Sequence, residues 1–372
     1  MNLNRKKFLD DLQVIEKLLA TSHIDKDIFW MKRKENNLFL VAFGGVGYLE
    51  LSMSPYAEIE GEENFQCALK LSQISHFIKN LKNEEVEMQI DMNENRILFL
   101  GPGKKKSEWY FQLINRFAPD RPYAYDDSKE FMPIELYDIT NGIEKTKFSI
   151  DKNQSHAPRT SVYLKISPKG IIIYTTDGIR ISRYKIRKDC QLSQDLFIPS
   201  FALEIVNRLF AIGGNDAQIL IDKNYFSLKS PDNKYFYFAP QENGNSTYPD
   251  VAKFFRKTNL FNVKISRSEL WDNIILSQAA DELIKIRMVF SDNLYLSAKT
   301  HSINFETSVK IAEPLEKPIE LQINSKLLTD VLSNGIKNEE FNIGISETPT
   351  QSQIKMLYLQ DDMYDHLIAQ TE

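Results

Sequence analysis

The stretch Tyr174-Thr-Thr-Asp-Gly-Ile-Arg-Ile-Ser182 is the most informative segment of this chain. Asp177 and Gly178 both tolerate the backbone angles of a tight turn, so the stretch by itself predicts only a turn. Its surroundings add more. Ser161-Val-Tyr-Leu-Lys-Ile166 precedes it as a strand-like run, and Ile198-Pro199 opens a helical pattern after it.

Helices that open at a serine recur along the chain. Three segments have apolar residues at the second and sixth positions after the serine: Ser72–Leu81, Ser200–Leu209 and Ser325–Leu332. This spacing places an apolar stripe on a helix, and we expect each serine to be the N-cap. A strand-like run follows in every case, namely Val86–Ile90, Ala217–Ile221 and Phe341–Ile345. The serines recur at intervals of roughly 125 residues, which is the size of a whole domain.

A second helix type recurs ahead of these helices. Phe8, Leu136 and Leu270 occupy its matching positions at nearly the same interval, although the pair Asn141-Gly142 would weaken its second copy. The chain has 372 residues, which accommodates three similar domains of about 124 residues. We expect these domains at 1–125, 126–252 and 253–372. Each would hold two helices packed on antiparallel sheets, which is an α+β fold.

Composition indicates a globular chain that buries a large core. Hydrophobic residues make up 42% and charged residues 26%, and no apolar run is long enough to span a bilayer. The net charge of −5 argues against a surface coated with positive charge, but it allows one confined to a single face. Cys67 and Cys190 are too few for a disulfide framework or a zinc site, so we expect free thiols in a reducing cytoplasm.

The sequence contains no recognisable constellation for catalysis or metal binding. Gly101–Lys106 lacks the spacing of a phosphate loop, and Asp91–Asn95 lacks the glycine and glutamate that complete a calcium loop. The five histidines are scattered, and no serine lies in a Gly-x-Ser-x-Gly elbow. We therefore expect no enzymatic activity, no cofactor and no metal, while a triad assembled from distant segments stays open as an alternative.

Taken with the three-fold repeat and with Tyr248-Pro249-Asp250, the stretch at 174–182 resembles the middle domain of the bacterial DNA sliding clamp, the β subunit of DNA polymerase III. An equivalent Thr-Asp-Gly-x-Arg run occurs in that family, and the resemblance covers essentially the whole chain. It implies the DNA clamp fold, in which two subunits of three domains close head to tail into a ring around duplex DNA. Helices would line the hole and contact phosphates without reading bases.

The resemblance also implies which side chains face the DNA. Lys79 and Arg208 match basic positions that face the duplex in the family. Helix polarity adds Arg5, Lys70 and Arg267 as candidates. For each of them, a merely solvated basic side chain is an equally good interpretation.

The subunit interface of similar clamps implies a second group of residues. Phe111 and Leu113, on the last strand of the first domain, would meet Ile275 and Leu276 at the end of a third-domain helix in the other copy. Ordinary core packing is the alternative for all four.

Partners of such clamps insert a short peptide with apolar anchors into a pocket between the second and third domains. The matching positions here are Thr176, Gly178, Ile179, Arg180, Ile181, Pro249, Phe254, Leu283, Asn324, Leu327, Leu367 and Ile368. The chain departs from the family at Arg159, where an apolar residue is usual, and at Ala369–Glu372, where a Met-Pro-Met-Arg-like tail is usual. Packing of a domain junction is the alternative interpretation.

These expectations combine into one function. The chain would be a DNA polymerase processivity factor, a cytoplasmic homodimeric ring that encircles double-stranded DNA without sequence preference and does not associate with membranes. It would tether the polymerase, the clamp loader and other replication or repair proteins through a short clamp-binding peptide. The alternative is a clamp-like protein-interaction scaffold that does not encircle DNA. An enzyme ranks last, because no catalytic constellation supports it.

Overall fold

The computed structural model describes residues 1–20, 26–34, 37–44, 47–54, 57–58, 64–100, 108–122, 130–152, 159–190, 193–213, 215–241, 248–255, 261–279, 284–299, 304–347 and 355–371. Contacts group the chain into two compact units. Unit 1 comprises Met1–Tyr137 and Pro199–Gln241, and unit 2 comprises Asp138–Ile198 and Glu242–Glu372.

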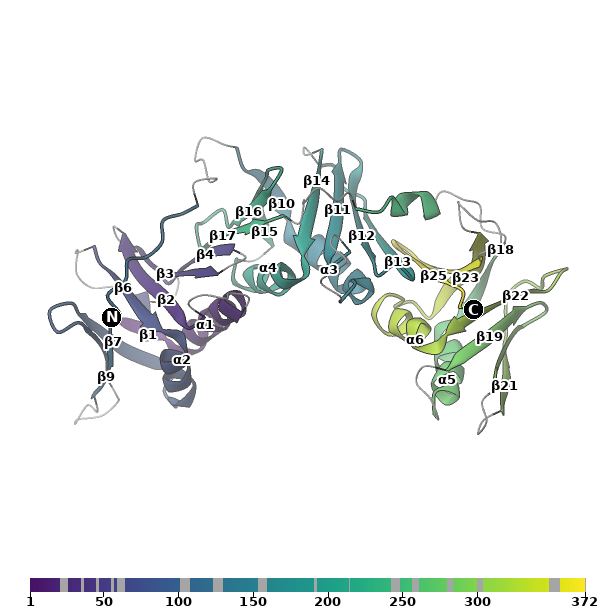
Figure 1. Ribbon diagram of the computed structural model, residues 1–372, viewed down its shortest axis with the longest axis horizontal. Coiled ribbons are helices and arrows are strands. Elements are labelled where there is room, and N and C mark those ends of the chain that lie inside the picture. Colours follow the sequence, from purple (N-terminus) through teal and green to yellow (C-terminus); the bar gives the residue numbers. More distant parts are fainter. Residues whose placement is uncertain are drawn as a thin grey trace. The chain divides into compact units, whose positions relative to one another are not determined.

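One pattern of elements occurs three times: a strand, a helix, a group of strands, a second helix and three strands (Figure 1). The first copy consists of β1 (Asn2–Asn4), α1 (Arg5–Ala20), β2 (Ile28–Lys34), β3 (Asn37–Gly44), β4 (Gly47–Ser52), β5 (Ala57–Glu58), β6 (Gln66–Lys70), α2 (Leu71–Asn80), β7 (Glu85–Asp91), β8 (Arg96–Leu100) and β9 (Glu108–Gln112). The second consists of β10 (Met132–Glu135), α3 (Leu136–Thr146), η1 (Lys147–Ser149), β11 (Ser161–Ser167), β12 (Gly170–Thr176), β13 (Arg180–Ile186), β14 (Gln194–Pro199), α4 (Ser200–Gly213), β15 (Asp216–Ile221), β16 (Tyr225–Lys229), β17 (Tyr235–Pro240) and η3 (Val251–Phe255). The third consists of β18 (Phe261–Ser266), α5 (Arg267–Ser277), β19 (Lys285–Phe290), β20 (Leu294–Lys299), β21 (Asn304–Val309), β22 (Ile319–Asn324), α6 (Ser325–Asn334), β23 (Glu340–Glu347), β24 (Lys355–Asp361) and β25 (Tyr364–Ala369). The predicted α+β fold class is confirmed.

The order of strands within the sheets repeats as well. The eight-stranded sheet of unit 1 runs β10-β15-β16-β17-β4-β3-β2-β6, and that of unit 2 runs β18-β23-β24-β25-β13-β12-β11-β14. The second order is the first one shifted by one repeat. Because these sheets run across the boundaries expected near 126 and 253, the two compact units divide the chain elsewhere. The three domain boundaries stay a prediction from the sequence repeat.

The strands that would make a third copy of this order are divided between two smaller sheets. Unit 1 contains β5-β1-β7-β8-β9, and unit 2 contains β21-β20-β19-β22. The run β1-β7-β8-β9 corresponds to β10-β15-β16-β17, and β21-β20-β19-β22 corresponds to β4-β3-β2-β6. In the eight-stranded sheets these halves are joined, whereas their counterparts β9 and β21 are edge strands within the chain.

Helices cover one face of each eight-stranded sheet (Figure 1). In unit 1, α1 packs on β3 and β4 and also contacts α2 and α4. Leu12, Ile15 and Leu19 of α1 are fully buried, and their spacing of three to four residues forms the apolar stripe that a surface helix turns toward a core. In unit 2, α5 and α6 pack together, and α6 contacts β25.

The serines expected to cap helices do not all do so. The N-cap of α2 is Lys70, and the carboxylate of Asp27 accepts from the Ser72 backbone N–H and hydroxyl, both at 2.6 Å. The N-cap of α6 is Asn324, whose side chain accepts from the Lys326 N–H at 2.8 Å. The serine prediction is wrong at these two helices, because Asn324, one residue earlier, caps α6, and at α2 the acceptor is the Asp27 carboxylate from another segment.

The Asn141-Gly142 pair has a packing role in α3. A Cβ at Gly142 would lie 2.6 Å from Ile173 Cδ1 and 2.6 Å from Tyr184 Cδ1. The Asn141 amide donates to the Tyr184 hydroxyl at 3.2 Å. Glycine therefore lets α3 lie close to β12 and β13, and this contact compensates for its low helix propensity.

Candidate functional site

An apolar surface lies in unit 2 where β13 pairs with β25. Its buried members are Tyr174, Ile181, Tyr248, Val251, Met356, Tyr358 and Leu367, and half-buried aromatic residues, including Tyr163, Phe197, Phe254 and Phe255, pack against them. The sequence prediction contained Ile181, Leu367 and Phe254 but missed the tyrosines. Tyr163 lies in the alternating run of β11 and Tyr174 in the largely apolar run of β12, and these strand patterns are the signal that could have located them.

Strand register divides the predicted pocket residues between two faces. Ile181 lies opposite Leu367, and Arg180 lies opposite Ile368. Neighbouring residues of a strand point to opposite faces, so Ile181 and Leu367 share the apolar surface while Arg180 and Ile368 lie on the other face. Arg180 and Ile368 therefore lie on the face away from the apolar surface.

A tight turn presents Ile179 beside this surface. Gly178 has φ +92°, a left-handed conformation that favours glycine. The Asp177 carboxylate accepts from the Ile179 and Arg180 N–H groups at 3.0 and 2.9 Å, and Thr176 Oγ1 accepts from the Gly178 N–H at 3.1 Å. These bonds hold the turn and leave the Ile179 side chain 54% exposed.

Two arginines, Arg180 and Arg159, donate hydrogen bonds to Asp177 of the turn. The Arg180 guanidinium donates to Asp177 (2.8 Å), to Asp330 of α6 (2.8 Å) and to the Phe148 carbonyl oxygen (2.7 Å). Arg180 thus donates to three groups within unit 2, and its place among the pocket residues stays a prediction. Arg159 is paired with Asp151 at 3.5 Å and donates to the Asp177 carbonyl at 3.4 Å, so it lies at the turn.

The remaining predicted pocket residues take separate places. Pro249 is exposed next to η3, and Phe254 is half-buried in it. Leu327 is half-buried on α6, and Asn324 is engaged as its N-cap. Leu283 lies outside the described residues.

A buried polar group lies on the helix-facing side of the β13–β25 pairing. His366 Nδ1 is 2.8 Å from Ser182 Oγ and 3.1 Å from the Tyr364 hydroxyl. Burial, and then the positive charge of Arg180, hold the pKa of His366 well below its usual value, so the ring is neutral at neutral pH. The serine–histidine contact is fully buried, so it cannot meet a substrate and is a packing feature.

The predicted subunit residues divide into exposed and buried ones. Ile275 and Leu276 at the end of α5 are 42% and 64% exposed. Of the two residues predicted for the opposing surface, Phe111 is half-buried against Phe77 and Phe99, and Leu113 is buried just after β9. Sequence reasoning missed Tyr110 of β9, which is 67% exposed.

The candidate DNA-facing residues also differ from one another. Lys70 and Lys79 are exposed at the two ends of α2. Arg208 of α4 donates to Gln13 of α1 at 3.3 Å, and Arg5 is half-buried at the start of α1. Arg267 donates to the Leu332 and Ile336 carbonyl oxygens at the end of α6, so it has a helix-capping role of its own.

Neither metal nor membrane features accompany these surfaces. Among the described residues, no group of three or more histidine, cysteine or acidic side chains is arranged to hold a metal ion. No helix in the described ranges is long and apolar enough to cross a membrane.

Comparison of the complete fold with solved structures decides the fold family. A Bacillus subtilis DNA polymerase sliding clamp superimposes with a TM-score of 0.83 at 14% identity, covering 100% of this chain and 98% of that one. The chain has the sliding-clamp fold. A Helicobacter pylori beta clamp bound to a DNA ligase peptide gives a TM-score of 0.79 at 15% identity, with 100% of both chains covered. A beta sliding clamp of Synechococcus elongatus is 22% identical over 295 residues, covering 76% of this chain and 76% of that one. No protein-family model matches the sequence.

Proposed function

We propose that this chain is a DNA sliding clamp, a processivity factor of DNA polymerase. Two copies would close head to tail into a ring around duplex DNA in the cytoplasm and tether polymerase and clamp loader. The clamp fold and the 22% identical relative named beta sliding clamp support this proposal. Without a catalytic constellation among the described residues, binding is the activity that the chain offers.

The observation that supports the proposal most strongly is the division of the third set of strands between two unjoined sheets. Pairing of β9 with β21 of a second copy would produce the order β1-β7-β8-β9-β21-β20-β19-β22, which is the order of both complete eight-stranded sheets. The join would be the counterpart of the β17–β4 and β25–β13 joins. Because β9 and β21 are different surfaces of one chain, the contact is heterologous, and two such contacts close a ring of two.

Apolar side chains accompany these edges. Tyr110 is exposed on β9, and α5, which contacts β21, exposes Ile275 and Leu276. A charge placed among them would be costly once the interface excluded water. We therefore expect Leu276→Asp to yield folded monomers, and sedimentation at nanomolar concentration measures the change. A Leu276→Asp variant that still sediments as a dimer would remove α5 from the interface.

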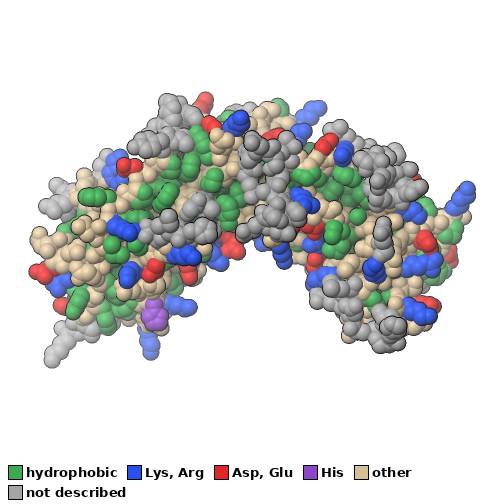
Figure 2. All heavy atoms as spheres, in the orientation of Figure 1, with side chains coloured by type: hydrophobic (Ala, Val, Ile, Leu, Met, Phe, Trp, Pro, Cys, Tyr) green, Lys and Arg blue, Asp and Glu red, His purple; other side chains and the backbone are tan. Residues whose placement is uncertain are grey.

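The DNA-facing surface would be formed by the helices. Lys70 and Lys79 lie exposed on α2, and phosphates are the groups that lysines at separate positions contact without base preference. Basic and acidic side chains are interspersed on the face of the molecule that Figure 2 shows. Contacts of this kind are weak and strongly salt-dependent, and they suit a ring that holds DNA by enclosing it.

The apolar surface at the β13–β25 pairing is the proposed site for the partner peptide. Ile179 is exposed at its rim, and Ile181, Leu367 and Phe254 form its floor and wall. The clamp from Helicobacter pylori binds a DNA ligase peptide, which supports a peptide site in this fold. Interface energy concentrates in a few apolar anchors, so one change at the rim should suffice to disrupt binding.

A labelled clamp-binding peptide titrated against the protein tests this site. We expect Ile179→Asp to weaken binding by 2 kcal/mol or more, that is roughly thirtyfold. The same variant should stay dimeric, whereas Leu276→Asp should lose the dimer and keep the peptide, so the two variants are controls for each other. Unchanged peptide affinity in Ile179→Asp would place the peptide elsewhere.

A further inference from the structure

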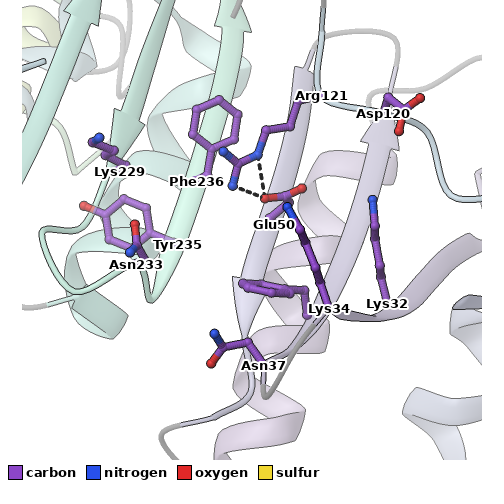
Figure 3. Close-up of a pocket in the computed structure, with 11 residues that line it drawn as sticks. Lys32, Lys34, Asn37, Glu50, Asp120, Arg121, Lys229, Asn233, Tyr235 and Phe236 are labelled. Carbon is purple, nitrogen blue, oxygen red and sulfur yellow. Dashed lines mark hydrogen bonds and ion pairs between the residues drawn. The ribbon is translucent and has the colours of Figure 1, made fainter. Parts of the chain in front are cut away.

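Unit 1 contains a pocket of about 610 Å³ on its eight-stranded sheet (Figure 3). It is lined by residues of β2, β3, β4, β16 and β17, together with Asp120 and Arg121. Leu40 and Leu51, which alternate with lining residues of β3 and β4, are fully buried, and α1 packs on these two strands. Since alternate residues point to opposite faces, the pocket opens on the face away from α1.

Strand register brings the lining side chains into adjoining rows. Lys229 lies opposite Phe236, and Phe236 lies opposite Glu50. In the neighbouring row Lys32 lies opposite Phe39. Directly opposed residues of antiparallel strands share one face. The lysines therefore stand beside an aromatic floor, with Phe236 between Lys229 and Glu50 in Figure 3.

Two acidic residues, Glu50 and Asp120, line the pocket, and Glu50 is already neutralised. Glu50 accepts from Arg121 Nε at 2.8 Å and is also bonded to Arg121 Nη2 and to the Tyr48 hydroxyl. Arg121 in turn lies over the Phe236 ring, with its guanidinium carbon 4.5 Å from the centroid. The Glu50–Arg121 pair is thus a fixed wall of the pocket and contributes little net charge.

Three lining ammonium groups form no ion pair with another described residue, and they outnumber the one remaining carboxylate of the lining, Asp120. Among the described residues, Lys32, Lys34 and Lys229 form no ion pair, and Lys229 has only the Phe131 ring, 4.2 Å from its Nζ. The chain as a whole carries a net charge of −5. A concave site with surplus positive charge on an acidic protein attracts an anionic ligand.

The position of the pocket indicates the kind of ligand. The β17–β4 junction is the counterpart, one repeat earlier, of the β25–β13 junction that carries the apolar surface of unit 2. Where the later junction gathers a cluster of apolar side chains, the earlier one presents lysines around Phe39 and Phe236. The two junctions therefore offer different chemistry on the same sheet framework.

We propose that this pocket binds a short acidic segment of a partner protein. Its Asp or Glu side chains would pair with Lys32, Lys34 and Lys229, and an apolar side chain would lie against Phe39. The choice of a peptide over nucleic acid rests on the proposed function, in which DNA contacts the helices, whereas this pocket opens on the opposite face. Charge pairing at such a partly exposed site would govern selectivity and association rate.

Fluorescence anisotropy with two labelled octapeptides tests the proposal. One peptide alternates glutamate with leucine or phenylalanine, and the other carries glutamine in place of every glutamate. The pocket variant is Lys32→Gln with Lys229→Gln. Its matched control is Lys165→Gln with Lys264→Gln, which removes two exposed strand lysines from unit 2. We expect the acidic peptide to bind the wild type and the control equally and the pocket variant about tenfold more weakly.

Three results would overturn the proposal. The first is equal affinity of the acidic peptide for the pocket variant and the control variant. The second is equal affinity of the two peptides for the wild type. The third is displacement of the acidic peptide by a labelled eight-nucleotide oligo-dT whose own binding depends on Lys32 and Lys229. The last would assign the pocket to nucleic acid. Sedimentation of the pocket variant is measured in parallel. If the pocket variant sediments as a dimer, the ring proposal is unaffected, whether or not that variant binds the acidic peptide.

Discussion

Arg180 shows how one side chain can hold a turn to the elements around it. It is only 9% exposed, and its three donor groups reach the turn at Asp177, helix α6 at Asp330 and the Phe148 carbonyl. Charge-assisted hydrogen bonds in such a fork are stronger than neutral ones. The Ile179 rim therefore depends on a contact made on the opposite face of the sheet.

Removal of this side chain should destabilise the protein. Arg180→Ala leaves Asp177 without its cation and Asp330 with only Lys326, 3.7 Å away, so we expect the free energy of unfolding in urea to fall by about 2–3 kcal/mol. Arg180→Lys keeps the charge but not the fork, and should recover only part of the loss. The exposed control Lys165→Ala should stay within about 0.5 kcal/mol of the wild type. An equally small effect for Arg180→Ala would contradict the network.

Sequence reasoning located the turn at 176–180 better than it predicted the contacts of its residues. Thr176, Gly178 and Ile179 were predictable because the turn is local and its residue types are demanding. The alternation of a strand could also have separated Ile368 from Leu367. The partners of Arg180 were not predictable, because Asp330 lies far along the chain and nothing near Arg180 indicates it.

Helix α3 depends on close approach to its sheet at Gly142. Gly142→Ala improves helix propensity by up to about 1 kcal/mol, but its Cβ would meet Ile173 Cδ1 and Tyr184 Cδ1 at 2.6 Å. We expect a net destabilisation of about 1–3 kcal/mol, measured by urea unfolding. Ile173→Val removes the Ile173 Cδ1 atom, so the double variant should lose less than the sum of the two single changes. Strict additivity would contradict this contact.

Elements were predictable where periodicity is strong, and their ends were not. The strands β7, β15 and β23 fall where alternating or apolar runs predict them. Helix caps depend on which acceptor reaches the orphan N–H groups, and at α2 that acceptor, Asp27, comes from a distant segment. The alternating sequence of β21 indicates a strand but does not indicate that one side of it has no neighbouring strand within the chain. The sequence therefore did not predict β21 as an edge strand.

The repeat of sheet order describes the whole molecule. Two complete eight-stranded sheets and two unjoined halves occur in one chain, and in the proposed ring a second copy would supply the matching half in each case. Repeat length and the Thr-Asp-Gly-x-Arg motif could predict the clamp fold. They could not predict which strands are left as edges, because pairing depends on the three-dimensional arrangement of the repeats.

Retention on circular DNA tests the ring most directly. Protein diluted to favour monomers is mixed with a nicked circular plasmid, concentrated to restore dimers, and passed through gel filtration at high salt. Salt removes phosphate contacts, so only enclosure can hold the protein on the DNA. We expect co-elution with the circle, release after one restriction cut, and no retention of Leu276→Asp. Equal elution behaviour with circular and linear DNA, whether bound or free, would contradict a clamp that encircles DNA.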